Sequence, residues 1–170
     1  MKELAAGRHL RFVSRNGWEF VERPGVHGIV VVVAVTPQAR LLLVEQWREP
    51  VGADVLELPA GLAGDDANAA GEPLEEAARR ELVEETGWDA AEVQRLTAGP
   101  PSAGVTSEIV TFFRARGLTR AGAGGGVEGE AITVHEVPLA EVDAWLSARE
   151  AAGVLVDPKV WAGAWFARRP

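Results

Sequence analysis

The chain contains no cysteine, no long apolar run and no excess of basic residues. The absence of cysteine excludes disulfides, thiolate nucleophiles and cysteine-ligated zinc, and it fits a reducing compartment. No apolar run approaches the roughly 20 residues of a membrane span, and the first residues lack the apolar stretch of a signal peptide. We therefore expect a cytoplasmic protein that makes no contact with membranes.

Net charge limits the partners that the chain can bind directly. The chain carries 17 basic and 25 acidic residues, which give a formal net charge of -8. This charge repels nucleic acid and anionic membranes. We expect no nucleic-acid partner, and a polyanionic small molecule would need a cation at its binding site.

The length of 170 residues suits one domain with a single core. Within it, two short apolar runs at 9–14 and 18–22 flank the dipeptide Asn16-Gly17, which is typical of a β-hairpin turn. We expect residues 1–25 to form an N-terminal β-hairpin that joins two chains into a homodimer. Residues 26–170 would form the main domain, because no repeat or linker divides them.

Two apolar runs, at 28–35 and 40–47, predict strands that are buried on both faces, at the centre of a mixed sheet. A short strand at 55–58 ends at Pro59. Further strands are expected near 92–98, 107–116 and 131–137, helices near 139–151 and 158–168, and a mobile glycine-rich loop at 121–126.

A helix is clearest between Glu72 and Gly87. Pro73 stands in its expected first turn, acidic residues follow, and Gly87 occupies the typical position of a C-terminal stop. The chain therefore has a helix that begins and ends with local signals.

Three glutamates of this helix, Glu81, Glu84 and Glu85, share the side of Leu74 and Ala78 when residues are spaced at about 100°. That side faces the core, where crowded carboxylates lose hydration and repel one another at a cost on the order of several kcal/mol. A hard divalent cation with oxygen ligands would compensate this cost. The pattern predicts a metal site, and a solvated charged face is the alternative interpretation.

The acids also form a motif, namely Glu72 followed by Arg80-Glu81-Leu82-Val83-Glu84-Glu85-Thr86-Gly87-Trp88. This motif resembles the Nudix hydrolase box at nearly every defining position. The resemblance implies an α/β fold, an α/β/α sandwich with a mixed β-sheet, that hydrolyses nucleoside diphosphates linked to another group. It implies that Mg²⁺ or Mn²⁺ is bound by Glu81 and Glu85, with Glu84 beside them and a backbone carbonyl near Ala60 or Gly61. Arg80 would anchor these carboxylates.

One stretch departs from the family pattern. Ten residues separate Gly61 from Glu72, where the family usually has five, so the loop at 62–71 carries an insertion. Asp65 and Asp66 in this loop are either additional metal contacts or parts of a solvated loop.

Segments outside the box are similar to the ADP-ribose pyrophosphatase branch of the family, namely Glu45-Gln-Trp-Arg48-Glu-Pro50 and Leu56-Glu57-Leu-Pro-Ala-Gly61. The resemblance implies that Arg48 and Glu57 contact substrate, and a bidentate guanidinium matches a phosphate oxygen pair. Trp18 and Trp47 flank the expected substrate side, where either could stack on an adenine.

The segment 102–108 resembles a further loop of this branch. Ala103 stands where the branch has the proline associated with ADP-ribose specificity. Glu108 in this loop would either reach the site or form a structural salt bridge.

The general base is expected in another loop, because glutamates already bound to metal are poor bases. The segment 127–135 resembles the loop that supplies the base in this branch, which makes Glu128 or Glu130 the candidate. Two solvated acids are the alternative. His135, in the following strand, is expected to pack there.

These features predict hydrolysis of ADP-ribose or a related nucleoside diphosphate sugar to a nucleoside monophosphate and a sugar phosphate. Three alternatives stay open. The enzyme could cleave UDP- or GDP-sugars, dinucleoside polyphosphates or coenzyme A. The chain could be a non-catalytic domain that binds an ADP-ribose-type ligand, or a structural protein whose acid cluster is incidental.

Overall fold

The structure is a computed structural model that describes residues 1–64, 71–127 and 130–169. Among these residues, no helix is long and apolar enough to cross a membrane. The elements are, in chain order, β1 (Lys2–Ala6), β2 (Arg11–Arg15), β3 (Trp18–Glu22), β4 (Gly28–Ala34), β5 (Arg40–Arg48), β6 (Ala53–Glu57), β7 (Ala60–Ala63), α1 (Leu74–Thr86), β8 (Trp88–Gly99), β9 (Val110–Arg120), β10 (Thr133–Pro138), α2 (Val142–Ala151), β11 (Leu155–Val156) and α3 (Pro158–Ala167).

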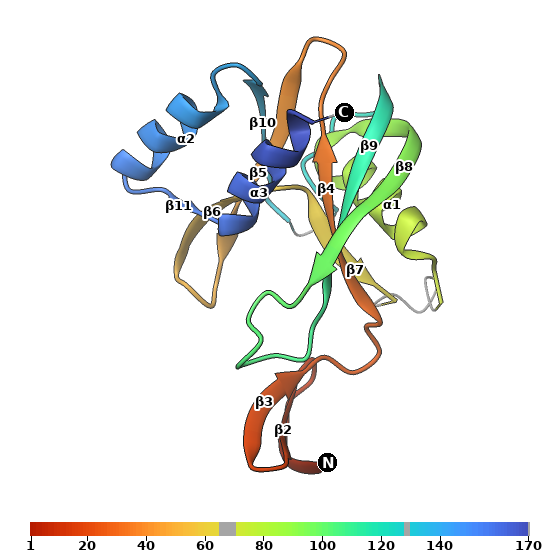
Figure 1. The fold of residues 1–170 in the computed structure, drawn as a ribbon, viewed down its shortest axis with the longest axis vertical. Coiled ribbons are helices and arrows are strands. Elements are labelled where there is room, and N and C mark those ends of the chain that lie inside the picture. Colours follow the sequence, from red (N-terminus) through yellow and green to blue (C-terminus); the bar gives the residue numbers. More distant parts are fainter. Residues whose placement is uncertain (65–70, 128–129, 170) are drawn as a thin grey trace.

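Two four-stranded sheets form the body, in the orders β7-β4-β9-β8 and β10-β5-β6-β11. Strands β4 and β9 pair in parallel, as do β6 and β11, while the other pairs in these sheets are antiparallel. Helices α1 and α3 lie on opposite sides of β4 (Figure 1). The α/β/α layering with mixed sheets is confirmed.

The prediction that β4 and β5 share one sheet is wrong. Strand β4 bonds to β7 along one edge and to β9 along the other, and β5 bonds to β10 and β6. Because both edges of each strand are hydrogen-bonded to other strands, β4 and β5 do not form a ladder with each other.

Strand β4 is buried on both faces, as its continuous apolar run predicts. Val31 and Val33 pack in the core that also holds residues of α2 and α3. Val30 and Val32 pack in the core under α1. Successive side chains of a strand point to opposite faces, so one strand serves both cores.

The local signals of α1 are where the sequence predicts them. Pro73 precedes the first residue, and Gly87 ends the helix in the left-handed conformation with φ of 71°. The N–H of Gly87 donates to the carbonyl of Val83. The helix therefore begins and ends as local chemistry dictates.

The glycine-rich loop at 121–126 is bonded to the C-terminal end of α1. The N–H groups of Gly125 and Gly126 donate to the carbonyls of Glu85 and Glu84 at 2.8 and 3.0 Å. The N–H groups of Ala121 and Gly122 donate to the carbonyl of Gly87. The sequence predicts a mobile loop, whereas in the structure the loop satisfies carbonyls that a helix end leaves unpaired.

The N-terminal sheet, β1-β2-β3, is antiparallel and lies at one end of the molecule (Figure 1). Its β2–β3 hairpin turns at Asn16 and Gly17, whose φ angles are 53° and 83°, as a type I′ turn requires. Residue Val21 joins this sheet to the body, because its backbone bonds to Val105 and Ser107 at 2.8 and 3.2 Å.

Three strands were not predicted. Strand β1 is exposed throughout and has no apolar alternation. Strand β7 begins directly after Pro59, where the sequence indicates only a turn. Strand β11 has two residues and exists through its pairing with β6.

Candidate active site

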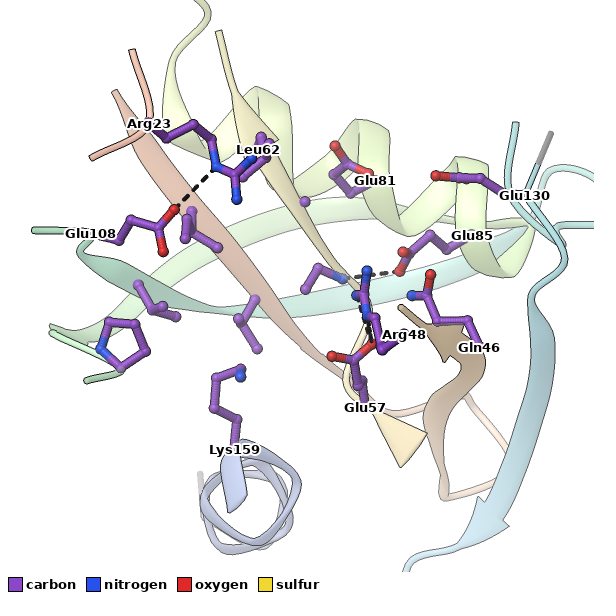
Figure 2. Close-up of a pocket in the computed structure, with 16 residues that line it drawn as sticks. Arg23, Gln46, Arg48, Glu57, Leu62, Glu81, Glu85, Glu108, Glu130 and Lys159 are labelled. Carbon is purple, nitrogen blue, oxygen red and sulfur yellow. Dashed lines mark hydrogen bonds and ion pairs between the residues drawn. The ribbon is translucent and has the colours of Figure 1, made fainter. Parts of the chain in front are cut away.

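A cavity of about 460 Å³ lies where α1, β7 and the first turn of α3 meet. It is lined by Arg23, Ile29, Val31, Gln46, Arg48, Glu57, Ala60, Gly61, Leu62, Glu81, Glu85, Pro101, Glu108, Val110, Glu130 and Lys159. Glu81, Glu85 and Glu130 gather on one side, and Lys159 lies across the cavity from them (Figure 2). The cavity therefore has an acidic side and a side with a cation.

Glu85 is the most buried acid of this cavity, with 5% of its surface exposed. Burial raises the pKa of its carboxyl to about 8; the N–H of Ala60, which donates to Oε2 at 2.9 Å, opposes this shift, and the charges of Glu81, Glu57 and Glu130 add to it. Four carboxyl groups therefore lie close enough in this cavity for their charges to repel one another. A divalent cation there would replace the proton that Glu85 otherwise retains.

Glu81 lies directly over Gly61, which β7 brings against α1. A methyl group on Gly61 would be 2.0 Å from the carboxyl carbon of Glu81. Only glycine leaves room for this carboxylate, so the requirement for Gly61 comes from close approach rather than from turn geometry.

Arg80 connects the acids behind the cavity. Its guanidinium donates to Glu72 at 3.2 Å, Glu81 at 2.8 Å, Glu84 at 3.0 Å and the carbonyl of Leu62 at 3.2 Å. Burial acts to lower the pKa of Arg80, but its bonds to Glu72 and Glu81 and their charges outweigh burial and raise the pKa. The insertion at 62–71 therefore does not separate Glu72 from the cluster.

Glu84 does not line the cavity in the described part of the chain. Its side chain is 33% exposed and accepts from Arg80 at 3.0 Å. Among the described residues, Glu81 and Glu85 are thus the two acids of α1 that line the cavity. Arg80 bonds to both Glu81 and Glu84.

Arg48 and Glu57 form an ion pair of 2.7 Å across β5 and β6, and both line the cavity. Gln46, two residues before Arg48, lines it as well. Trp47 lies between them in β5 and is 53% exposed. Strand alternation turns its side chain to the opposite face, so the structure does not bring Trp47 into this cavity.

Trp18 also lies outside this cavity. It is 69% exposed in β3 and lines a separate hollow with Phe20, Ala103 and Ser107. The structure therefore places the aromatic ring and the residue at the expected proline position together, apart from the acidic cluster.

Glu108 forms an ion pair and also lines the cavity. Its carboxylate accepts from Arg23 at 3.1 Å, and both residues line the cavity. Lys159, in the first turn of α3, pairs with Asp157 and also lines the cavity. No sequence motif marks Arg23 or Lys159. Gln46 lies in the family-like segment 45–50 but was not predicted as a site residue, and the fold brings the three together.

Glu130 lines the acidic side of the cavity, and its Oε2 accepts from the N–H of Val127 at 3.0 Å. The other candidate base, Glu128, lies outside the described residues, as do Asp65 and Asp66. His135 is packed within β10 as expected, with Nε2 2.7 Å from Glu45 Oε2.

The donor chemistry fits a hard divalent cation such as Mg²⁺ or Mn²⁺. The acids offer carboxylate oxygens, and Glu85 holds its charge only with compensation. Among the described residues, no three His, Asp or Glu side chains already form a ligand set. Glu81 and Glu85 would hold such a cation, whose charge would offset the repulsion between their carboxylates.

Comparisons with known proteins give a consistent result. The NUDIX domain model matches residues 26–160. An ADP-ribose pyrophosphatase of Bacillus subtilis (strain 168) is 39% identical over 59% of this chain and 50% of its own length. A GDP-mannose pyrophosphatase of Citrobacter koseri is 33% identical over 73% of this chain and 66% of its own length. A methanol dehydrogenase activator of Bacillus methanolicus is 33% identical over 72% of this chain.

The matched part covers 63% and 50% of the lengths of the Bacillus methanolicus and Bacillus subtilis relatives. Among solved structures, a crystal structure of an ADP compounds hydrolase aligns with a TM-score of 0.67 at 23% identity. The alignment covers 86% of this chain and 80% of that one. This likeness supports the fold.

Proposed function

The chain belongs to the NUDIX domain family, and from this premise we propose that it hydrolyses the diphosphate bond of a nucleoside diphosphate sugar such as ADP-ribose or GDP-mannose. The products would be a nucleoside monophosphate and a sugar phosphate. The observation that carries the proposal is Glu85, a buried carboxylate that faces Glu81, Glu57 and Glu130 in one cavity. In a chain of net charge -8, such a cluster attracts a cation that can in turn hold a diphosphate.

We propose Mg²⁺ or Mn²⁺ as the cation, with Glu81 and Glu85 as its principal ligands. The backbone carbonyl at Ala60 would contribute, and Glu84 would join when Arg80 releases it. A bound divalent cation would offset the negative charge that spreads over the phosphoryl oxygens during the reaction.

The other lining residues would bind and orient the substrate. Arg48, held by Glu57 at 2.7 Å, can donate two hydrogen bonds to phosphate oxygens. Lys159, across the cavity from Glu81, Glu85 and Glu130, and Arg23, which is paired with Glu108, would supply further donors for the sugar or nucleoside part. The sequence alone predicts Arg48 as a substrate contact, whereas the positions of Lys159 and Arg23 follow from the fold.

Glu130 is the proposed general base among the described residues. It lies at the cavity on a loop that is bonded to α1, and in our proposal it takes a proton from the attacking water. Glu128, on the same loop, is the alternative base.

Hydrolysis assays with ADP-ribose and GDP-mannose, with and without Mg²⁺, test this function. We expect release of nucleoside monophosphate only with the divalent cation. Glu85→Gln should lower kcat/KM by about 100-fold or more, while Glu92→Gln, an exposed acid outside the cavity, should not. Turnover of Glu85→Gln near the wild-type value at saturating Mg²⁺ would contradict the metal site.

The base is tested separately. Glu130→Gln should fold, bind Mn²⁺ as measured by electron paramagnetic resonance, and lose roughly 10²-fold in kcat. If Glu128→Gln has this effect instead, Glu128 is the base. If neither variant loses activity, the base does not come from this loop.

We also propose a cytoplasmic homodimer. The cytoplasmic location agrees with the absence of cysteine. Cell fractionation tests it, and recovery of the protein outside the cytoplasm would contradict it.

The dimer would form through the N-terminal sheet, which exposes large apolar side chains, namely Met1, Leu4, Leu10, Phe12 and Trp18.

A further inference from the structure

A second cavity, of about 270 Å³, lies on the same face of β4 as the first. Val31 lines the first cavity, whereas Val33 and Val35 line the second. Lys159 in the first turn of α3 reaches the first cavity, and Arg169, just beyond its last turn, reaches the second. The two cavities are therefore separated by the length of α3, which packs against β4.

Three arginines line this second cavity, namely Arg114, Arg116 and Arg169. Arg114 and Arg116 are two residues apart in β9, so their side chains share the face that carries α3. Within the described ranges no Asp or Glu lines the cavity, and none of the three guanidiniums has a carboxylate at ion-pair distance. Most arginines of this chain have such a partner, so the cluster is a local excess of positive charge.

Arg114 is the buried member, with 9% of its surface exposed. Its Nη2 donates to the carbonyl of Phe166 at 2.9 Å, which supports the end of α3. Desolvation and the charge of Arg116 lower the pKa of Arg114. A guanidinium has five N–H donors, and the support of α3 uses one. A second cation beside it adds to the cost of burial unless an anion is bound.

Arg169 is held in place before any ligand arrives. Its guanidinium carbon lies 3.7 Å from the centre of the Trp165 ring, which is a close cation–π contact. This contact restrains an otherwise exposed side chain at the rim of the cavity. The three guanidiniums thus form a partly ordered set of donors.

We propose that this arginine cavity, lined by Arg114, Arg116 and Arg169, binds a phosphate or pyrophosphate group at a site separate from the acidic cavity. Three forked guanidiniums match the several oxygens and the multiple charge of such a group. The apolar floor of Val33 and Val35 strengthens these charge interactions by excluding water. The proposal is independent of the hydrolase function, because it uses none of the acids of the first cavity.

Isothermal titration calorimetry with the full chain in the presence of a chelator tests the site. The titrants are inorganic phosphate, pyrophosphate and adenosine monophosphate, with acetate as a control anion. We expect saturable binding of one phosphate or pyrophosphate per chain. If adenosine monophosphate binds and the same arginines are required, the natural ligand is a phosphomonoester. If adenosine monophosphate does not bind, the ligand is the free phosphate or pyrophosphate ion.

Variants locate the binding. The double variant Arg116→Ala/Arg169→Ala changes two exposed side chains and should weaken phosphate binding at least about tenfold. Arg95→Ala removes an exposed arginine without an ion-pair partner from the opposite face of the sheet, where it pairs with Phe113, and should have less than a twofold effect. Arg48→Ala, which removes a cation of the first cavity, should leave phosphate binding at the arginine cavity unchanged.

Several results would overturn the proposal. The first three are an absence of binding at millimolar phosphate, equal binding of acetate, and equal losses in Arg95→Ala and the double variant. The fourth is a loss of binding in Arg48→Ala. The last result would place the anion in the first cavity. Melting temperatures measured beside each titration exclude unfolding as a cause.

Discussion

The fold opposes ionisation of the Glu85 carboxyl. This carboxyl is buried, and three neighbouring acids act on it. The N–H of Ala60 at 2.9 Å offsets only part of this cost. A residue that lowers the stability of the metal-free protein and attracts a cation is expected at a catalytic site.

The pH dependence of stability tests this view. The pKa of Glu85 rises on folding from 4.5 to about 8, so the folded state binds an extra proton between these values. The contribution of Glu85 to stability is full below pH 4.5 and is lost as pH rises through 8. The loss is on the order of 5 kcal/mol at most.

We therefore expect Glu85→Gln to melt at a higher temperature than the wild type at pH 8.5 in chelator, and the difference to shrink toward about pH 5, where Glu85 is protonated. The amide oxygen of the variant still accepts from Ala60. Added Mg²⁺ at pH 8.5 should raise the melting temperature of the wild type and leave that of the variant unchanged. A difference that is independent of pH would contradict the assignment.

Gly61 offers a test of the geometry alone. In Gly61→Ala the new methyl group would lie 2.0 Å from the carboxyl carbon of Glu81, which is the far end of a flexible side chain. We expect Glu81 to move, the melting temperature to stay within about 3 °C, and kcat/KM to fall about tenfold or more. Wild-type kinetics in this variant would show that the position of Glu81 is unimportant.

At the scale of elements, α1 and the loop at 121–126 act as a unit. The loop bonds to the last carbonyls of α1 and leads on to Glu130. The acids of the helix and the proposed base are thus positioned by one contact between segments that are distant in sequence. Changes in the packing of this loop should therefore affect both stability and activity.

Two glycines of this loop make a matched pair. A methyl group on Gly124, whose φ is +74°, would lie 2.4 Å from the carbonyl carbon of Thr86, whereas one on Gly122 meets nothing within 4 Å. Gly124→Ala should destabilise the fold by about 1–3 kcal/mol and reduce kcat, and Gly122→Ala should do neither. Urea unfolding and steady-state kinetics measure the two effects, and equal behaviour of the two variants would contradict the docked loop.

The elements themselves differ in how well the sequence predicts them. The ends of α1 follow from Pro73 and Gly87, because caps act on neighbouring residues. Strand β7 and the assignment of β4 and β5 to separate sheets did not follow, because strand pairing depends on partners far along the chain.

At the scale of the whole molecule, the N-terminal sheet is the proposed dimer interface. Trp18 is 69% exposed there, and Trp47, outside this sheet, is 53% exposed. We expect sedimentation velocity to show a dimer of the 18.1 kDa chain. Trp18→Ser should raise the dissociation constant about tenfold or more, since exposed aromatic residues often dominate interfaces, and Trp47→Ser should not.

Either a monomeric wild type or equal weakening by both substitutions would contradict this interface. The same experiment bears on Trp18 as a substrate contact. A dimer could bring Trp18 of one chain near the cavity of another, and in that case Trp18→Ser would also raise KM in proportion to the loss of dimer.

Local patterns in the sequence were enough to predict the helix with Glu81 and Glu85 on its inner side, the strands buried on both faces, and the family resemblance. These features depend on the 3.6-residue and two-residue periods and on caps, which are local. The tertiary structure was needed to show that Arg80 binds Glu84, which does not line the cavity in the described part of the chain, and that Arg23 and Lys159 complete the cavity. Those positions depend on which strands pair and where the helices pack, and contacts between distant residues are not encoded in any short segment.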